Sequence, residues 1–207
     1  MEITGSSIRN LTFHTFELDG ELGKFFGKLE RYKLAIALTG DSGAGKSNFS
    51  FRICRIFMER GFRIKYYSLE EGIGALTKQK VLDNKLESDN FSITDTGTMD
   101  TLRTDAQRYD LIAVDSFGKL TRDPKEFDGL RQEFPDTVFL CIFQKTTDGK
   151  VRGGSSIVFD SSATIDVVEV RDTEKKVIDR VATMKKGRYG TSGWVYSIMQ
   201  DKIIKRG

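Results

Sequence analysis

The sequence predicts an α/β fold: a mostly parallel central sheet flanked by helices, with a C-terminal antiparallel extension. Between residues 33 and 143, short apolar runs typical of strands buried on both faces alternate with segments of helical periodicity. From residue 164 onward apolar and polar residues alternate instead, which is typical of antiparallel strands. No Gly/Ser/Pro-rich linker interrupts the 207 residues, so we expect a single domain over 1–207.

Each element is expected from a local pattern. The parallel strands are predicted from apolar runs at 33–38, 63–67, 91–94, 111–114 and 137–143. The helices are predicted at 46–60, through 76–82, at 99–108 and at 125–133. Gly61 ends the first of these helices and Pro135 follows the last. The antiparallel strands are predicted at 164–170, 177–184 and 194–198.

The amino-acid composition limits the kinds of functional site that the chain can carry. Hydrophobic residues make up 38% and charged residues 30%, and no apolar run is long enough to span a bilayer, so we expect a cytoplasmic protein without a membrane partner. The two cysteines lie far apart and lack neighbours at metal-ligand spacing. The single histidine, His14, argues against a histidine-based zinc site or catalytic triad. Carboxylates, lysines and backbone groups remain as the candidate chemistry.

A glycine-rich loop between the first apolar strand and the first helix matches G-x-x-x-x-G-K-[ST]. Its residues are Gly40, Asp41, Ser42, Gly43, Ala44, Gly45, Lys46 and Ser47. Glycines let the backbone N–H groups point at phosphate oxygens, and the helix N-terminus adds a favourable dipole. In such a loop Lys46 reaches the β- and γ-phosphates and the Ser47 hydroxyl is a ligand for Mg²⁺. The pattern predicts a site for ATP and Mg²⁺.

Asp115 follows four apolar residues, as in a Walker B strand. At the carboxyl end of a buried strand it would lie beside the phosphate loop. We therefore expect Asp115 to join Ser47 in the nucleotide and metal site.

With the glycine-rich loop and the strand that ends in Asp115, the chain resembles the RecA superfamily of P-loop ATPases over about residues 10–200. Within that superfamily it resembles the group of RadA, DnaB-type helicases and KaiC. Four further segments carry the resemblance, and they follow one another in the order that the family has. A segment containing leucine and aspartate, 16–23, precedes the phosphate loop, and the sequence Tyr-Ser-Leu-Glu-Glu stands at 67–71. A later strand ends in Gln144, and the segment 184–190 contains a Lys-x-Arg-x-Gly pattern. The chain also resembles the core-only members of phages and mobile elements. The resemblance implies a RecA-like P-loop NTPase fold.

The resemblance also implies roles for particular residues. Glu70 matches the family's catalytic glutamate; Glu71 could share that role or simply complement a helix dipole. Gln144 matches the sensor of the γ-phosphate. Lys186 and Arg188 match residues that reach into a neighbouring subunit's ATP site, and the alternative is a basic hairpin on a solvated edge. A site completed in this way requires a homo-oligomer, either a ring such as a hexamer or a filament.

The segment 145–154 lies where the family contacts single-stranded DNA. Its Lys145, Lys150 and Arg152 suit phosphate contact, but it lacks an aromatic residue for base stacking, and a surface turn is the alternative. The leading hypothesis is a Mg²⁺-dependent ATPase acting on single-stranded DNA in recombination or annealing. The alternatives are a helicase or translocase ring and a KaiC-like, ATP-dependent switch or scaffold without DNA.

Overall fold

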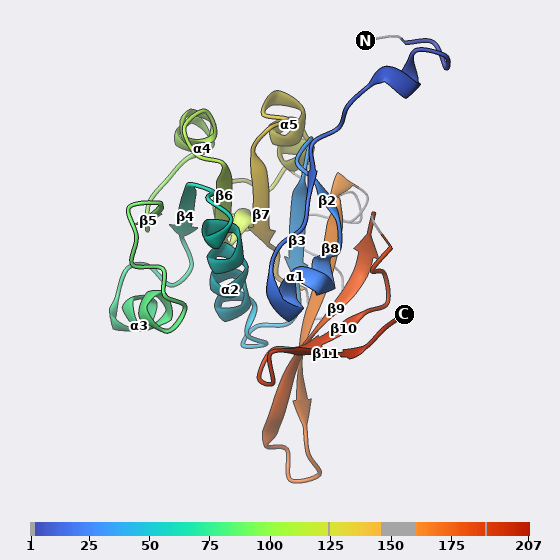
Figure 1. Cartoon of the computed structure of the whole chain (residues 1–207). Helices are drawn as coiled ribbons and strands as arrows, with labels where there is room; N and C mark the ends of the chain where they lie inside the picture. The colour runs from blue at the N-terminus through green and yellow to red at the C-terminus, as the bar shows by residue number, and fades with distance from the viewer. Residues whose placement is uncertain (1–2, 124, 146–159, 189) are drawn as a thin grey trace.

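The computed structural model describes residues 3–123, 125–145, 160–188 and 190–207. Its framework is a nine-stranded sheet in the order β11-β10-β9-β8-β3-β7-β6-β4-β5 (Figure 1). The strands of this sheet are β3 (Ala35–Thr39), β4 (Ile64–Ser68), β5 (Phe91–Thr94), β6 (Leu111–Asp115), β7 (Val138–Ile142), β8 (Ala163–Arg171), β9 (Val177–Gly187), β10 (Val195–Ser197) and β11 (Lys202–Lys205). The helices are α1 (Gly20–Phe26), α2 (Lys46–Glu59), α3 (Ala75–Asp83), α4 (Met99–Ala106) and α5 (Lys125–Glu133).

The sheet has a parallel part and an antiparallel part. Strands β5, β4, β6, β7, β3 and β8 run parallel to one another. Strands β9, β10 and β11 continue the sheet in antiparallel pairing from β8. The predicted fold class is confirmed. The carboxyl ends of the parallel strands meet at one edge of the sheet, which is where open α/β sheets place their ligand sites.

Helices cover both faces of the parallel part. On β3, Ile36 and Leu38 point into the core that contains α1 and α2, whereas Ala35 and Ala37 point into the core that contains α4 and α5. All five β3 residues are buried, as expected for a strand covered on both sides. In Figure 1, α1 and α2 lie on the near face of the sheet.

The elements missing from the sequence prediction are short or lie at a sheet edge. They are α1, β11, the two-residue strands β1 (Thr15–Phe16) and β2 (Leu29–Glu30), and the single turns η1 (Ile8–Asn10) and η2 (Phe117–Lys119). The first large strand begins at Ala35 and not at Lys33, because Lys33 has a φ of +54°, outside the β region.

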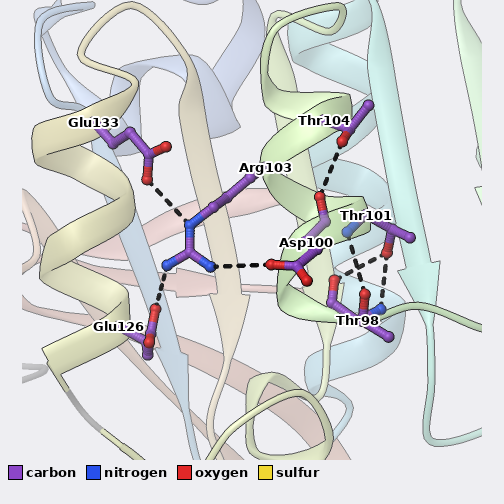
Figure 2. Close-up of polar contacts among 7 residues, drawn as sticks. All are labelled: Thr98, Asp100, Thr101, Arg103, Thr104, Glu126 and Glu133. Atoms are coloured by element: carbon purple, nitrogen blue, oxygen red, sulfur yellow. Dashed lines mark hydrogen bonds and ion pairs between the residues drawn. The ribbon is translucent and has the colours of Figure 1, made fainter.

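Helices α4 and α5 are tied together by one arginine (Figure 2). Arg103 of α4 contacts Glu126 at 2.5 Å and Glu133 at 3.1 Å, both on α5. The start of α4 is fixed by a capping box, in which Thr98 and Thr101 each accept a hydrogen bond from the other's backbone N–H. These contacts hold the two helices over β6 and β7.

In the described ranges, no helix is both long and apolar enough to cross a membrane.

Candidate functional site

The loop between β3 and α2 requires glycine at two positions. Gly40 has a φ of +146°, and a Cβ there would stand 2.2 Å from the carbonyl oxygen of Val167 on β8. Gly45, the residue before α2, has a φ of +97°, a conformation that side chains disfavour. The fixed glycines of the motif are thus explained by backbone geometry.

Lys46 is the first residue of α2, and it is almost fully buried, with 7% of its surface exposed. Its ammonium group donates hydrogen bonds to the carbonyl oxygens of Gly40, at 2.9 Å, and Asp41, at 2.6 Å. Burial lowers the pKa of Lys46, and the carboxylates of Asp115 and Glu70 oppose that shift. The lysine is therefore held across its own loop, with two acidic groups near its charge.

Asp115 ends β6 beside the start of α2, as predicted. Burial raises the pKa of its carboxyl group, and a hydrogen bond from the Ser47 side chain opposes this shift. The Tyr66 hydroxyl donates a hydrogen bond to Asp115 Oδ2 at 3.4 Å. The structure thus brings together Ser47 and Asp115, the two residues expected to hold Mg²⁺.

Glu70 and Gln144 meet although they are far apart in the sequence. Gln144 Nε2 donates to Glu70 Oε1 at 2.5 Å. The backbone N–H groups of Leu69 and Glu70 both donate to the carbonyl oxygen of Asp115, at 2.7 and 3.0 Å. These bonds fix the end of β4 to the end of β6, so the two acidic residues expected at the site hold a defined relative position.

Glu71 is directed elsewhere. Its carboxylate forms an ion pair with Lys80 of α3 at 2.5 Å. Glu70 lines the pocket at the loop and Glu71 does not. Of the two adjacent glutamates, Glu70 therefore lies at the edge of the pocket and Glu71 is held by α3.

The pocket at the phosphate loop has a volume of about 480 Å³. Its lining comes from the loop, the first turn of α2, α3, and the ends of β4, β6 and β7, together with one residue of β9. The lining residues are Ser42, Gly43, Gly45, Lys46, Ser47, Asn48, Glu70, Leu76, Gln79, Lys80, Asp83, Asp115, Gln144 and Arg180. This size suits a ligand as large as a nucleotide.

The residues present fit a magnesium nucleotide. The described part of the chain has no cluster of three or more histidine, cysteine or acidic residues that could bind a metal without help. Mg²⁺ in nucleotide sites needs only one or two protein oxygens, because phosphates and water supply the rest. The hydrogen-bonded pair of Ser47 and Asp115 offers such a set, and Lys46 supplies positive charge next to it.

Arg180 lines the pocket but was not identified from the sequence. It lies on β9 opposite Glu169 of β8, and its guanidinium contacts that carboxylate at 3.0 Å. No motif marks this position. Only the pairing register of β8 and β9, which the sequence does not show, brings it level with the loop.

Lys186 and Arg188 do not line the pocket of their own chain. Lys186 pairs with Thr164, and the Arg188 N–H donates to the Ser162 carbonyl at 3.3 Å, both near the start of β8. The phosphate loop follows Thr39, which pairs with Asp166 farther along β8. Burial and the neighbouring positive charges of Arg188 and Arg131 lower the pKa of Lys186. The two basic residues therefore form a separate group with Arg131.

Of the three residues expected to contact DNA, the structure describes Lys145. Its ammonium group pairs with Asp166 at 2.6 Å, and its backbone N–H donates to the Gly40 carbonyl at 3.3 Å. Thr39 also donates to Asp166, at 2.9 Å. Lys145 is thus held against the base of the phosphate loop. Lys150 and Arg152 lie outside the described residues.

No protein-family model matches this sequence, and no curated protein matches it. Among solved structures, the chain is similar to the flagellar accessory protein FlaH from Methanocaldococcus jannaschii, with a TM-score of 0.69 and 13% identity. The similarity covers 94% of this chain and 100% of the other. At this level of identity, the similarity informs on the fold alone. Together with the sheet order and the loop after β3, it shows that the chain has a RecA-like fold.

Proposed function

We propose that the chain is a Mg²⁺-dependent ATPase of the RecA superfamily, related to the group of RadA, DnaB-type helicases and KaiC and to its core-only members in phages and mobile elements. One observation carries the proposal. Side chains from four separate segments converge on one pocket: Lys46 and Ser47, Glu70, Asp115 and Gln144. A chance match to the loop motif would not bring these particular groups to its edge.

Binding is assigned to the loop. Its backbone N–H groups and the Lys46 ammonium neutralise phosphate charge. The contacts of Lys46 with the carbonyls of Gly40 and Asp41 are exchanged for phosphate oxygens when the nucleotide enters. Ser47 and Asp115 hold Mg²⁺, which supplies further charge neutralisation at the phosphates.

Hydrolysis is assigned to the pair of Glu70 and Gln144. The Glu70 carboxylate orients a water molecule and accepts its proton as the water attacks the γ-phosphorus. Gln144 already donates to Glu70, so it can couple the presence of a γ-phosphate to the position of that carboxylate. The bonds from the amides of Leu69 and Glu70 to Asp115 keep this machinery in register with the metal-binding residues.

We further propose that the protein works as a homo-oligomer, in a ring or a filament. Lys186 and Arg188 cannot serve the pocket of their own chain, because they lie toward the opposite end of β8 from the phosphate loop. In a neighbouring copy they would supply positive charge to the transition state, the role of an arginine finger.

Single-stranded DNA is the proposed partner, on the basis of the basic segment after β7. A second candidate, an ATP-dependent switch or scaffold that does not bind DNA, is favoured by the placement of Lys145. That lysine is engaged with Asp166, so it is less available to a DNA phosphate than its sequence position indicated.

The test measures nucleotide affinity and ATP hydrolysis by the purified chain, with and without Mg²⁺, beside those of Lys46→Ala and Lys119→Ala. Lys119 is an exposed lysine outside the pocket, so its variant controls for the loss of one positive charge. Lys46→Ala should weaken nucleotide binding about 10- to 100-fold, the usual cost of a lost hydrogen bond between charged groups, whereas Lys119→Ala should match the parent. Unchanged affinity in Lys46→Ala would remove the assignment of this pocket.

The same assay separates the two candidate functions. Added single-stranded DNA should increase the rate of hydrolysis, with a response that weakens as salt is raised. If the rate of hydrolysis does not change when DNA is added at low salt, and the protein does not bind DNA, the switch is supported instead.

A further inference from the structure

Arg180 occupies a position beside the phosphate loop that the proposed machinery does not use. Thr39, the last residue of β3 before the loop, pairs with Asp166 of β8. Strands β8 and β9 continue beyond this point, and Glu169, three residues after Asp166, pairs with Arg180 of β9. The arginine stem then lies against the loop. A Cβ built on Gly45 would stand 2.6 Å from Arg180 Cδ and 3.2 Å from Nε. The absence of a side chain at Gly45 is what allows this close approach.

The guanidinium is only partly satisfied. Nη2 contacts the carboxylate of Glu169 at 3.0 Å. Nε is buried, and no hydrogen-bond partner for it exists in the described part of the chain. A buried donor of a permanently charged group is costly when it has no acceptor. This donor lies next to Gly45, in the part of the loop whose N–H groups receive the α- and β-phosphates.

We propose that Arg180 binds the α/β-phosphate part of the nucleotide in its own chain, with Nε donating to a phosphate oxygen while Nη2 stays on Glu169. The inference rests on the proposed nucleotide site. Lys46 reaches the β- and γ-phosphates, whereas Arg180 lies beside Gly45. The contribution of Arg180 is therefore common to ADP and ATP. It is a binding residue in its own chain, distinct from the basic residues proposed to act across a subunit boundary.

The test is calorimetric titration of the full chain with Mg-ADP and with Mg-ATP. Arg180→Met keeps the bulk of the stem but loses the donors. We expect it to weaken both nucleotides by a similar factor, about 10- to 100-fold, as for other hydrogen bonds between charged groups. The matched control is Arg171→Met. Arg171 also pairs with Glu169 but does not line the pocket, so this variant should bind both nucleotides as the parent does.

The outcomes separate this inference from the proposed function. Parent-like binding of both nucleotides by Arg180→Met overturns the role of Arg180, and so does a loss confined to ATP. Equal losses of affinity in Arg180→Met and Arg171→Met also overturn it, because the cause would then be a change at Glu169 and in the β8–β9 hairpin, and not a lost contact with phosphate. Parent-like binding by Lys46→Ala instead overturns the nucleotide site itself.

Folding of Arg180→Met is checked by its thermal unfolding without nucleotide. If the variant does not fold, Arg180→Lys replaces it, since lysine keeps the aliphatic stem and the charge but has no Nε donor. We expect Arg180→Lys to lose affinity for ADP and for ATP by the same factor, and by a smaller factor than is expected for Arg180→Met. Unchanged affinity in that variant overturns the proposal.

Discussion

Two adjacent glutamates illustrate what single residues contribute. Glu70 and Glu71 are adjacent carboxylates after β4, and the sequence favoured Glu70 while keeping Glu71 as a residue that could share its role. Their partners distinguish them: Glu70 is bonded by Gln144, whereas Glu71 is paired with Lys80. The proposed hydrolytic role therefore falls to Glu70, whereas Glu71 ties the loop after β4 to α3.

Replacing each glutamate by glutamine should give opposite results. Glu70→Gln keeps its shape and can still bond Gln144, but it cannot accept a proton, so ATP should bind normally while single-turnover hydrolysis slows by about 10²–10⁴. Glu71→Gln weakens an ion pair with Lys80 and should hydrolyse ATP within a fewfold of the parent rate. If Glu71→Gln hydrolyses ATP slowly and Glu70→Gln hydrolyses it at the parent rate, the assignment is wrong by one residue.

Most of the candidate site could be predicted because its members directly follow strands. Asp115, Glu70 and Gln144 come at or just after the carboxyl ends of β6, β4 and β7, which meet at one edge of a parallel sheet. Arg180 could not be predicted in this way. Its place depends on the register of β8 against β9, and the placement of Lys145 likewise depends on where Asp166 falls in the pairing of β8 with β3.

At the scale of elements, the sequence was most informative where periodicity runs over many residues. Helix α5 has the bounds that were predicted, 125–133, and α2 ends at Glu59, one residue before its predicted end. Helix α1, with seven residues, is too short for a periodic pattern to stand out, and β11 is an edge strand in which only one residue is partly buried. Their positions are set by packing: Leu22, Phe25 and Phe26 of α1 are buried in the core that α1 shares with α2.

The contacts of Figure 2 allow a test of what holds α4. Arg103→Met removes its charged contacts with Glu126 and Glu133, whereas Thr98→Ala removes the uncharged helix cap. Each should lower the free energy of unfolding by about 1 kcal/mol in urea titrations at low salt. In 1 M salt, a concentration at which the screening length is about 3 Å, the Arg103→Met deficit should shrink and the Thr98→Ala deficit should persist. A deficit in Arg103→Met that salt leaves unchanged would point to lost packing.

On the scale of the whole molecule, two basic residues lie away from the pocket of their own chain. Lys186 and Arg188 lie near Ser162 and Thr164, toward the end of β8 that is remote from the loop. The proposed oligomer accounts for this arrangement, since a second copy can bring these residues to a pocket that they do not line within one chain.

Mixing two inactive variants tests this shared site. Arg188→Ala should bind ATP but hydrolyse it slowly, as Glu70→Gln does. A mixture of the two should regain part of the parent rate, because one kind of mixed interface contains an intact Glu70 and an intact Arg188. The rate of the parent should also rise with protein concentration as the oligomer forms. Full activity in a monomer, or a mixture that stays inactive while subunits exchange, would contradict the proposal.

The position of β3 in the sheet has a consequence for how the protein is made. This strand appears early in the chain, but its neighbours β7 and β8 come late, and the Ala35 N–H donates to a side chain 127 residues away, that of Ser162. Gly40 likewise lies against the Val167 carbonyl. Pairings between such distant segments are slow to form. During synthesis, the phosphate loop must therefore wait for β8 to leave the ribosome before its surroundings are complete, although its own residues emerge more than 100 residues earlier.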